Sequence, residues 1–209
     1  ENWIPAVARV AMSKGGVGEI DLFDLLKNSF RQNPNYVIVG EVRGKEAFVL
    51  FQGMASGHPS ISTMHADSVD TLIKRLETPP IELSPTLVNS LDCVAIMTHA
   101  LIKKNETRRL REIVEIVNVK ADGMVIVNTP FVWNPAQDTF YFKKESKVFE
   151  KISGRYGLSV EELQKEFANR SKLIYELYRR KIFGFDDVRK VVVDYYRNSK
   201  TVLEKFGIN

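Results

Sequence analysis

Tyr36-Val37-Ile38-Val39-Gly40-Glu41 and Gly57-His58-Pro59-Ser60-Ile61-Ser62-Thr63-Met64-His65 are the two stretches that decide the fold of this chain. The continuous apolar run of the first predicts a β-strand that is covered on both faces, with Glu41 just beyond its end. The second predicts a short strand over 61–64 that ends at His65. Because ligands of open α/β folds bind beyond the carboxyl ends of parallel strands, we expect Glu41 and His65 to lie at one shared edge.

Helices and strands alternate around these two stretches. Apolar periodicity with capping and stop residues predicts helices over 21–32, 44–55, 67–78 and 85–91, and β-rich runs predict strands over 36–39, 61–64 and 93–97. Alternating strands and helices are typical of an α/β fold with a mostly parallel sheet.

The pattern changes twice in the rest of the chain. Past Lys104 only strands are predicted, over 113–119, 124–132 and 139–142, and they would form an antiparallel edge of the same sheet. From residue 144 onward the period is helical, with Ser159 and Glu162 as a capping box and with Gly157 and Gly184 separating three helices. The predicted domains are therefore 1–143 and 144–209, the second being a small helical appendage.

The composition indicates a globular chain without a membrane span. The 209 residues are 44% hydrophobic, which is enough for a substantial core, and no apolar run approaches the length that crosses a bilayer. The chain begins with Glu1 and shows no signal sequence, so we expect it to start inside a longer protein. The single cysteine, Cys93, excludes disulfides within the chain and Cys-rich zinc modules.

Charge is unevenly distributed along the sequence. Residues 1–142 hold 14 Lys and Arg against 16 Asp and Glu, whereas residues 143–209 hold 16 against 10. A basic surplus of this kind suits anionic lipid, nucleic acid or an acidic partner, but on helices it is more often a solvated surface.

A phosphate-binding loop is missing from the sequence. The pattern Gly-x-x-x-x-Gly-Lys-Ser/Thr, whose amides and side chains hold phosphate and Mg²⁺, does not occur between Glu1 and Asn209. Ser13–Gly18 has the glycines, but Glu19 and Ile20 follow where a lysine and a hydroxyl are needed. We interpret this segment as a flexible connection before a helix.

Glu41 and His65 are the candidate catalytic residues. A carboxylate beyond a buried strand can polarise an attacking water and help to hold Mg²⁺ through water, although an apolar strand followed by Gly-Glu is also a common structural pattern. The His65 imidazole can donate a hydrogen bond to a terminal phosphate oxygen. His58 is expected to fix the turn before the strand, and its spacing from His65 matches no standard zinc ligand pair.

Three arginines are candidates for stabilising the charge that develops in phosphoryl transfer. Arg43 is the best placed, because it lies two residues after Glu41. Arg31 ends a predicted helix, where a cation also favours the helix dipole, and the surroundings of Arg9 leave its role open.

Gly40-Glu41-Val42-Arg43-Gly44, together with the stretch from Gly57 to Ala66, resembles the Walker B and histidine-box motifs of the secretion-superfamily ATPases, which serve type II secretion, type IV pili and archaeal archaella. Phe149 to Phe206 resembles the C-terminal helical region of archaeal members, so the resemblance spans almost the whole chain. The four-Cys zinc insert of bacterial secretion members is missing, which favours the archaeal branch.

This resemblance implies the C-terminal part of a RecA-like P-loop motor core, followed by the helical appendage. It implies that Glu41 is the catalytic glutamate and a ligand of Mg²⁺ through water, that His65 is the histidine-box residue, and that ATP and Mg²⁺ are the cofactors. The other nucleotide-binding residues that it implies are Arg43, Arg31, Arg9, Gly40 and His58.

The resemblance also implies a cellular setting. Family members are homo-hexameric rings that lie in the cytoplasm, peripheral on the inner face of the cell membrane. They couple ATP hydrolysis to protein secretion, or to assembly of a type IV pilus-like filament or archaellum, through a polytopic membrane platform protein. Because the Walker A loop is missing, we expect ATPase activity from the full-length protein and not from this chain alone.

Two other functions stay open at this point. The chain could be a catalytically inactive interaction module, which a phosphate loop upstream of Glu1 would exclude. It could also be a nucleic-acid motor of the conjugation or packaging type, as the basic C-terminal part suggests. The sequence has no basic stripe interleaved with aromatic residues, so no nucleic acid is expected as a partner.

Overall fold

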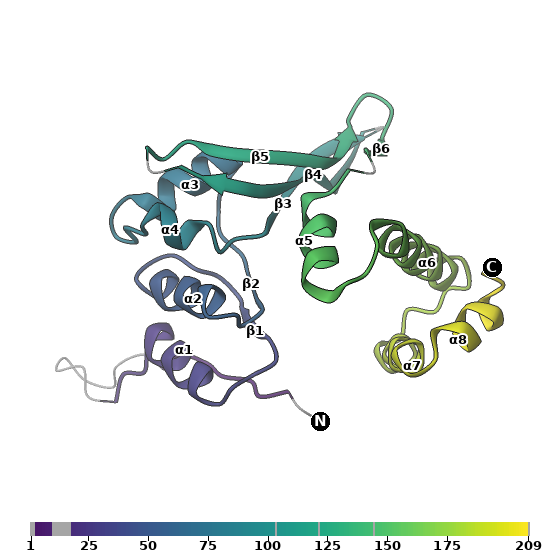
Figure 1. Ribbon diagram of the computed structural model, residues 1–209, viewed down its shortest axis with the longest axis horizontal. Coiled ribbons are helices and arrows are strands. Elements are labelled where there is room, and N and C mark those ends of the chain that lie inside the picture. The colour runs from purple at the N-terminus through teal and green to yellow at the C-terminus, as the bar shows by residue number, and fades with distance from the viewer. Residues whose placement is uncertain (1–2, 10–17, 103, 121, 144, 209) are drawn as a thin grey trace. The chain divides into compact units, whose positions relative to one another are not determined.

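The computed structural model describes residues 3–9, 18–102, 104–120, 122–143 and 145–208 (Figure 1). The chain forms two compact units, Glu1–Ser146 and Lys147–Asn209. The sequence analysis divides the chain after residue 143, and the structure divides it after Ser146. Residues 13–17 of the segment interpreted as a flexible connection lie outside the described residues.

The first unit begins with a pair of parallel strands and their helices. The elements, in chain order, are α1 (Leu22–Arg31), β1 (Val37–Val39), α2 (Glu46–Ala55) and β2 (Ser60–Ser62). β1 pairs in parallel with β2 along all three residues of each strand. α2 supplies the crossover, since parallel neighbours cannot be joined by a tight turn. The predicted helices, strands and order are confirmed for this part of the chain.

The remainder of the first unit is two short helices and a second sheet. These elements are α3 (Val69–Glu77), α4 (Pro85–Val88), β3 (Cys93–Ile102), β4 (Asn105–Val119), β5 (Val125–Asn134) and β6 (Thr139–Phe142). The four strands form one antiparallel sheet in the order β3-β4-β5-β6 (Figure 1).

The expectation of one mostly parallel sheet with an antiparallel edge is therefore wrong for the described residues. The structure has a two-stranded parallel sheet and, separate from it, the four-stranded antiparallel sheet. β3 runs on to Ile102 and is followed almost at once by β4 at Asn105. A connection this short can only reverse the chain, so β4 returns antiparallel along β3. Among the described residues, β3 does not pair with β2.

The core of the first unit lies between its helices and the parallel strands. Leu50 and Ala47 of α2 are fully buried, and so is Val88 of α4. α1 packs closely on α2 because Gly53 has no side chain: a Cβ there would overlap the ring of Phe30. The same Phe30 ring meets His58 edge to face, with 5.1 Å between ring centroids.

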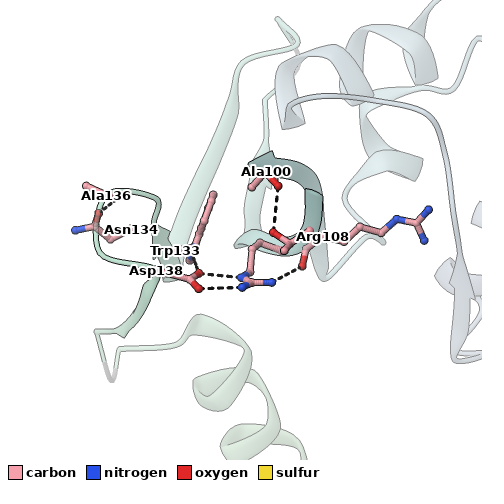
Figure 2. A network of polar contacts seen from close by, with 8 residues as sticks. Ala100, Arg108, Trp133, Asn134, Ala136 and Asp138 are labelled. Carbon is pink, nitrogen blue, oxygen red and sulfur yellow. Dashed lines mark hydrogen bonds and ion pairs between the residues drawn. The ribbon is translucent and has the colours of Figure 1, made fainter. Parts of the chain in front are cut away.

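Asp138 ties the tip of the antiparallel sheet together, as Figure 2 shows. Its carboxylate accepts two hydrogen bonds from the Arg109 guanidinium, both at 2.8 Å, and one from Trp133 Nε1 at 2.9 Å. Such a bidentate pair has a defined geometry as well as charge. It fixes the β5–β6 turn against β4.

A buried carboxylate holds the end of the first unit on this sheet. Glu115 of β4 is 4% exposed and accepts a hydrogen bond from Asn128 Nδ2 at 2.8 Å and one from the Ser146 hydroxyl. Asn128 also donates to the Glu145 carbonyl at 3.2 Å. The charge is thus buried with donors on both carboxylate oxygens, as burial of an ion requires.

The second unit is helical, with α5 (Lys147–Tyr156), α6 (Val160–Arg179), α7 (Phe185–Arg197) and α8 (Ser199–Phe206). The predicted capping box is confirmed, because Ser159 and Glu162 satisfy each other's backbone N–H groups. The described residues of this unit form four helices where three were expected. The extra break is at Asn198, whose extended φ of −154° ends α7 and whose side chain caps α8.

Gly53→Ala should lower the free energy of unfolding of the first unit by about 1–3 kcal/mol, because the new methyl group overpacks the Phe30 ring. Urea titration measures the change. Gly154→Ala in α5 is the matched control, since a Cβ there meets nothing within 4 Å. A Gly53→Ala chain as stable as wild type would contradict the close packing of α1 on α2.

Candidate functional site

Parallel pairing continues beyond β1 and β2 and brings Glu41 near His65. Val42 N donates to the Thr63 carbonyl at 2.9 Å, and the Thr63 hydroxyl donates to the Gly40 carbonyl at 2.5 Å. These bonds align the residues that follow the two strands. The structure therefore places the two candidate catalytic residues together at the carboxyl edge of the parallel pair.

The Glu41 carboxylate lies between two cationic or ionisable groups. Arg43 Nη2 is 2.5 Å from Glu41 Oε2, and His65 Nε2 is 3.2 Å from Glu41 Oε1. The hydrogen bond from Arg43 lowers the pKa of Glu41, and the same bond raises the pKa of Arg43. Both groups are therefore ionised throughout the physiological pH range.

One oxygen of Glu41 is shielded from solvent and has no hydrogen-bond donor among the described residues. Oε1 is inaccessible to solvent and accepts no hydrogen bond within the described residues, because His65 Nε2 is close but not aligned for one. The Glu41 side chain is 29% exposed as a whole, whereas that of His65 is 83% exposed. An ionised oxygen without a donor among the described residues is suited to accept a hydrogen bond or a proton once a side-chain movement opens it to water.

The turn that carries Arg43 is held by a second carboxylate. Glu46 Oε1, in the first turn of α2, accepts hydrogen bonds from Arg43 N at 2.6 Å and Gly44 N at 2.8 Å. A carboxylate that accepts backbone N–H groups at a helix start is a stabilising arrangement. The main chain beside Glu41 is therefore fixed even though the Arg43 side chain is 74% exposed.

A cavity of about 370 Å³ opens beside Glu41. Glu41, Arg43 and His65 line one part of it, and Arg75 of α3 and the turn at 78–81 line another. The two guanidinium groups and the one carboxylate together give the cavity a net charge of +1. That excess favours an anionic ligand such as a phosphoryl group.

Arg31 and His58 lie in a different cavity, of about 500 Å³, which is lined chiefly by α1, α2 and the turn after α2. His58 Nδ1 is buried and without a hydrogen-bond partner among the described residues. Arg9 forms an isolated antiparallel bridge with Ile20 and donates from Nε to the Gly18 carbonyl at 2.6 Å. The structure thus groups Gly40, Arg43, Glu41 and His65, and leaves Arg9, Arg31 and His58 apart from them.

Two arginines of this region were missed from the sequence. Arg75 lines the cavity of Glu41. Arg111 of β4 donates from Nη2 to the Asp67 carbonyl at 2.8 Å, which ties the antiparallel sheet to the segment after His65. The helical phase of α3 could have identified Arg75 as lying off the buried face, but no local pattern could have paired Arg111 with Asp67.

The described residues offer a single carboxylate for a metal at this site. No group of three or more His, Cys, Asp or Glu side chains able to hold a metal ion occurs within the described ranges. Mg²⁺ fits this donor set, because it keeps several waters and is commonly held by one or two carboxylates together with substrate phosphates. In the part of the chain that the structure describes, no helix is both long enough and apolar enough to cross a bilayer.

Comparison with known proteins identifies a family and several relatives. Residues 6–150 match the family model described as type II/IV secretion system protein. An uncharacterized protein of Methanocaldococcus jannaschii is 36% identical over 197 residues, which cover 93% of this chain and 72% of the relative. The conjugal transfer protein TrbB of Rhizobium radiobacter is 30% identical over 115 residues, covering 54% of this chain and 36% of the relative.

A third relative, the type IV secretion system protein PtlH of Bordetella pertussis, is 38% identical over 65 residues, covering 31% of this chain and 19% of the relative. The chain therefore spans only a part of the length of these proteins, most of it in the first and a minor part in the other two. The family match includes the strands, Glu41 and His65, and it extends over more than half of the sequence. The chain belongs to the type II/IV secretion system protein family.

Proposed function

We propose that this chain is part of a motor that couples ATP hydrolysis to protein secretion or to assembly of a type IV pilus-like filament or archaellum. The observation that carries the proposal is the ionised Glu41 carboxylate beside His65, with one shielded oxygen free of hydrogen bonds. Membership of the type II/IV secretion family supports it.

The proposed reaction is attack of water on the terminal phosphorus of ATP. The water oxygen forms a bond to phosphorus while the bond to the bridging oxygen breaks, and ADP leaves with that electron pair. The Glu41 carboxylate orients the water and accepts its proton, and the exposed His65 donates a hydrogen bond to a phosphate oxygen. Mg²⁺, held by Glu41 through water and by the phosphates, supplies neutralisation of the phosphate charge when bound.

We propose that β1 and β2 are two strands of a larger, RecA-like parallel sheet in the complete protein. Parallel strands are normally covered on both faces, yet Ile38 is 56% and Ile61 is 58% exposed here. The phosphate loop that this chain lacks would then come from another part of the polypeptide. Hydrolysis is accordingly proposed for the complete protein and not for the 209 residues alone.

The assembly that fits this function is a homo-hexameric ring, in the cytoplasm and peripheral on the inner face of the cell membrane, that acts on a polytopic membrane platform protein. The similarity to a protein of the archaeon Methanocaldococcus jannaschii over 93% of the chain supports the archaeal branch. A motor for conjugation is the second candidate, and the similarity to the conjugal transfer protein TrbB favours it. Stimulation of hydrolysis by DNA would support that candidate over secretion.

Glu41→Gln in the complete protein should lower kcat by about 100-fold or more, because the amide accepts no proton from the water, while ATP affinity changes little. Steady-state hydrolysis and binding of a fluorescent ATP analogue measure the two effects. Undiminished hydrolysis would refute the role of Glu41. A wild-type protein that binds but never hydrolyses ATP would support the inactive interaction module instead.

His65→Ala should lower kcat by about 10-fold to 100-fold through loss of a hydrogen bond to the terminal phosphate. Since the side chain is 83% exposed, the melting temperature should stay close to that of wild type. His99→Ala, another exposed histidine but on β3 and outside the cavity, is the control. A large fall in melting temperature for His65→Ala would mark a structural role.

Arg31 should act on a neighbouring subunit if it acts on nucleotide at all, because it lies in a different cavity from Glu41 of its own chain. Mixing inactive Arg31→Ala and Glu41→Gln proteins tests this. Random mixed rings would regain about a quarter of the sites, each with Glu41 from one subunit and Arg31 from the next. No recovery on mixing would place the action of Arg31 within its own subunit.

A further inference from the structure

Arg75 is the feature of the site that the proposed function leaves without a role. It lies in the last turn of α3 and lines the same cavity as Glu41 and His65. Its side chain is exposed, and its guanidinium makes no hydrogen bond or ion pair within the described residues. An exposed arginine whose five donors have no protein partner, and which lines the same cavity as a proposed catalytic carboxylate, is available to bind an anion.

The other guanidinium of the cavity is already engaged. Arg43 Nη2 lies 2.5 Å from Glu41 Oε2, and this pair is the contact that holds the carboxylate in place. Moving Arg43 onto a phosphate would remove that partner from Glu41. Arg75 can bind a phosphate without disturbing the carboxylate, and it is the source of the cavity's excess positive charge.

The position of Arg75 is set by the core. Leu72, Ile73 and Leu76 are 8%, 3% and 1% exposed, so the buried face of α3 fixes the rotation of the helix about its axis. This rotation directs Arg75 to the side where Glu41 lies. The turn after the helix is held as well, since Leu83 N donates to the Leu76 carbonyl at 2.7 Å.

Stabilisation of the helix end is the competing explanation for Arg75. Cations in the last turn of a helix interact favourably with its dipole. The last turn of α3, however, also contains Lys74, which meets that need and does not line the cavity. The helix dipole therefore explains a cation in this turn, but it does not explain an arginine that lines the cavity of Glu41.

We propose that Arg75 is a catalytic residue, whose guanidinium binds the terminal phosphoryl group of the nucleotide in the cavity beside Glu41 and His65. This inference rests on the proposed function. The charge that develops in phosphoryl transfer would then be stabilised by an arginine of the same chain as Glu41. Arg31 of that chain cannot take this role, because it lines a different cavity.

The test compares Arg75→Gln, Arg75→Lys and the control Lys74→Gln in the complete protein. Arg75→Gln should lower kcat/KM for ATP by about 100-fold, with Arg75→Lys intermediate and Lys74→Gln within about twofold of wild type. The affinity for ADP, which has no terminal phosphate, should change by less than about twofold. Inhibition by inorganic phosphate should weaken for Arg75→Gln if the guanidinium also binds the released product.

Three outcomes would overturn the inference. Hydrolysis by Arg75→Gln could be unchanged, its affinity for ADP could fall as much as its kcat/KM for ATP, or Lys74→Gln could lose as much kcat/KM as Arg75→Gln. None of them touches the proposed function, which stands as long as wild type hydrolyses ATP and Glu41→Gln does not. If wild type hydrolyses no ATP, the proposed function fails, and binding of inorganic phosphate to wild type and to Arg75→Gln then decides the inference by itself. Weaker phosphate binding by Arg75→Gln than by wild type would preserve the inference that Arg75 binds a phosphoryl group. Equal phosphate binding by the two proteins would overturn that inference.

Discussion

The parallel pairing of β1 with β2 is the constraint on which the site depends. The parallel pairing alone would bring the carboxyl ends of β1 and β2 near each other. The hydrogen bonds from Val42 to Thr63 and from Thr63 to Gly40 extend this alignment to Glu41 and His65. Two short segments that are separated by a whole helix thus deliver a carboxylate and an imidazole to one point. The buried valines of β1 and the fully buried residues of α2 keep that pairing in place.

Much of the fold could be predicted because its signals are local. Asp21 caps α1, Ser159 and Glu162 form the capping box of α6, and an apolar run marks β1. The antiparallel pairing was predicted, but the inclusion of β3 in that sheet could not be, because the reversal between β3 and β4 uses Lys104 at a φ of 69° where a glycine would have marked a turn. The break between α7 and α8 carries only a weak local signal, because Asn198 is the one cap residue there and no glycine or proline stands beside it.

The residues of the candidate site also differ in whether local sequence signals could predict their positions. Glu41 and His65 could be paired from sequence because each follows a recognisable strand. Arg75 could not, since its relation to Glu41 depends on the rotation of α3 that three buried side chains impose. The separation of Arg31 and His58 from Glu41 is likewise a tertiary property: both lie where α1 packs on α2, around the space that Gly53 leaves for Phe30.

The hydrogen bond from Arg111 to the Asp67 carbonyl joins the antiparallel sheet to the main chain just after His65. Arg111 is also held at its own position by Glu112, whose Oε1 is 2.8 Å from the same nitrogen. A displacement of the main chain at Asp67 would therefore stretch or break this bond to β4. Through it the antiparallel sheet restrains the main chain two residues beyond the histidine.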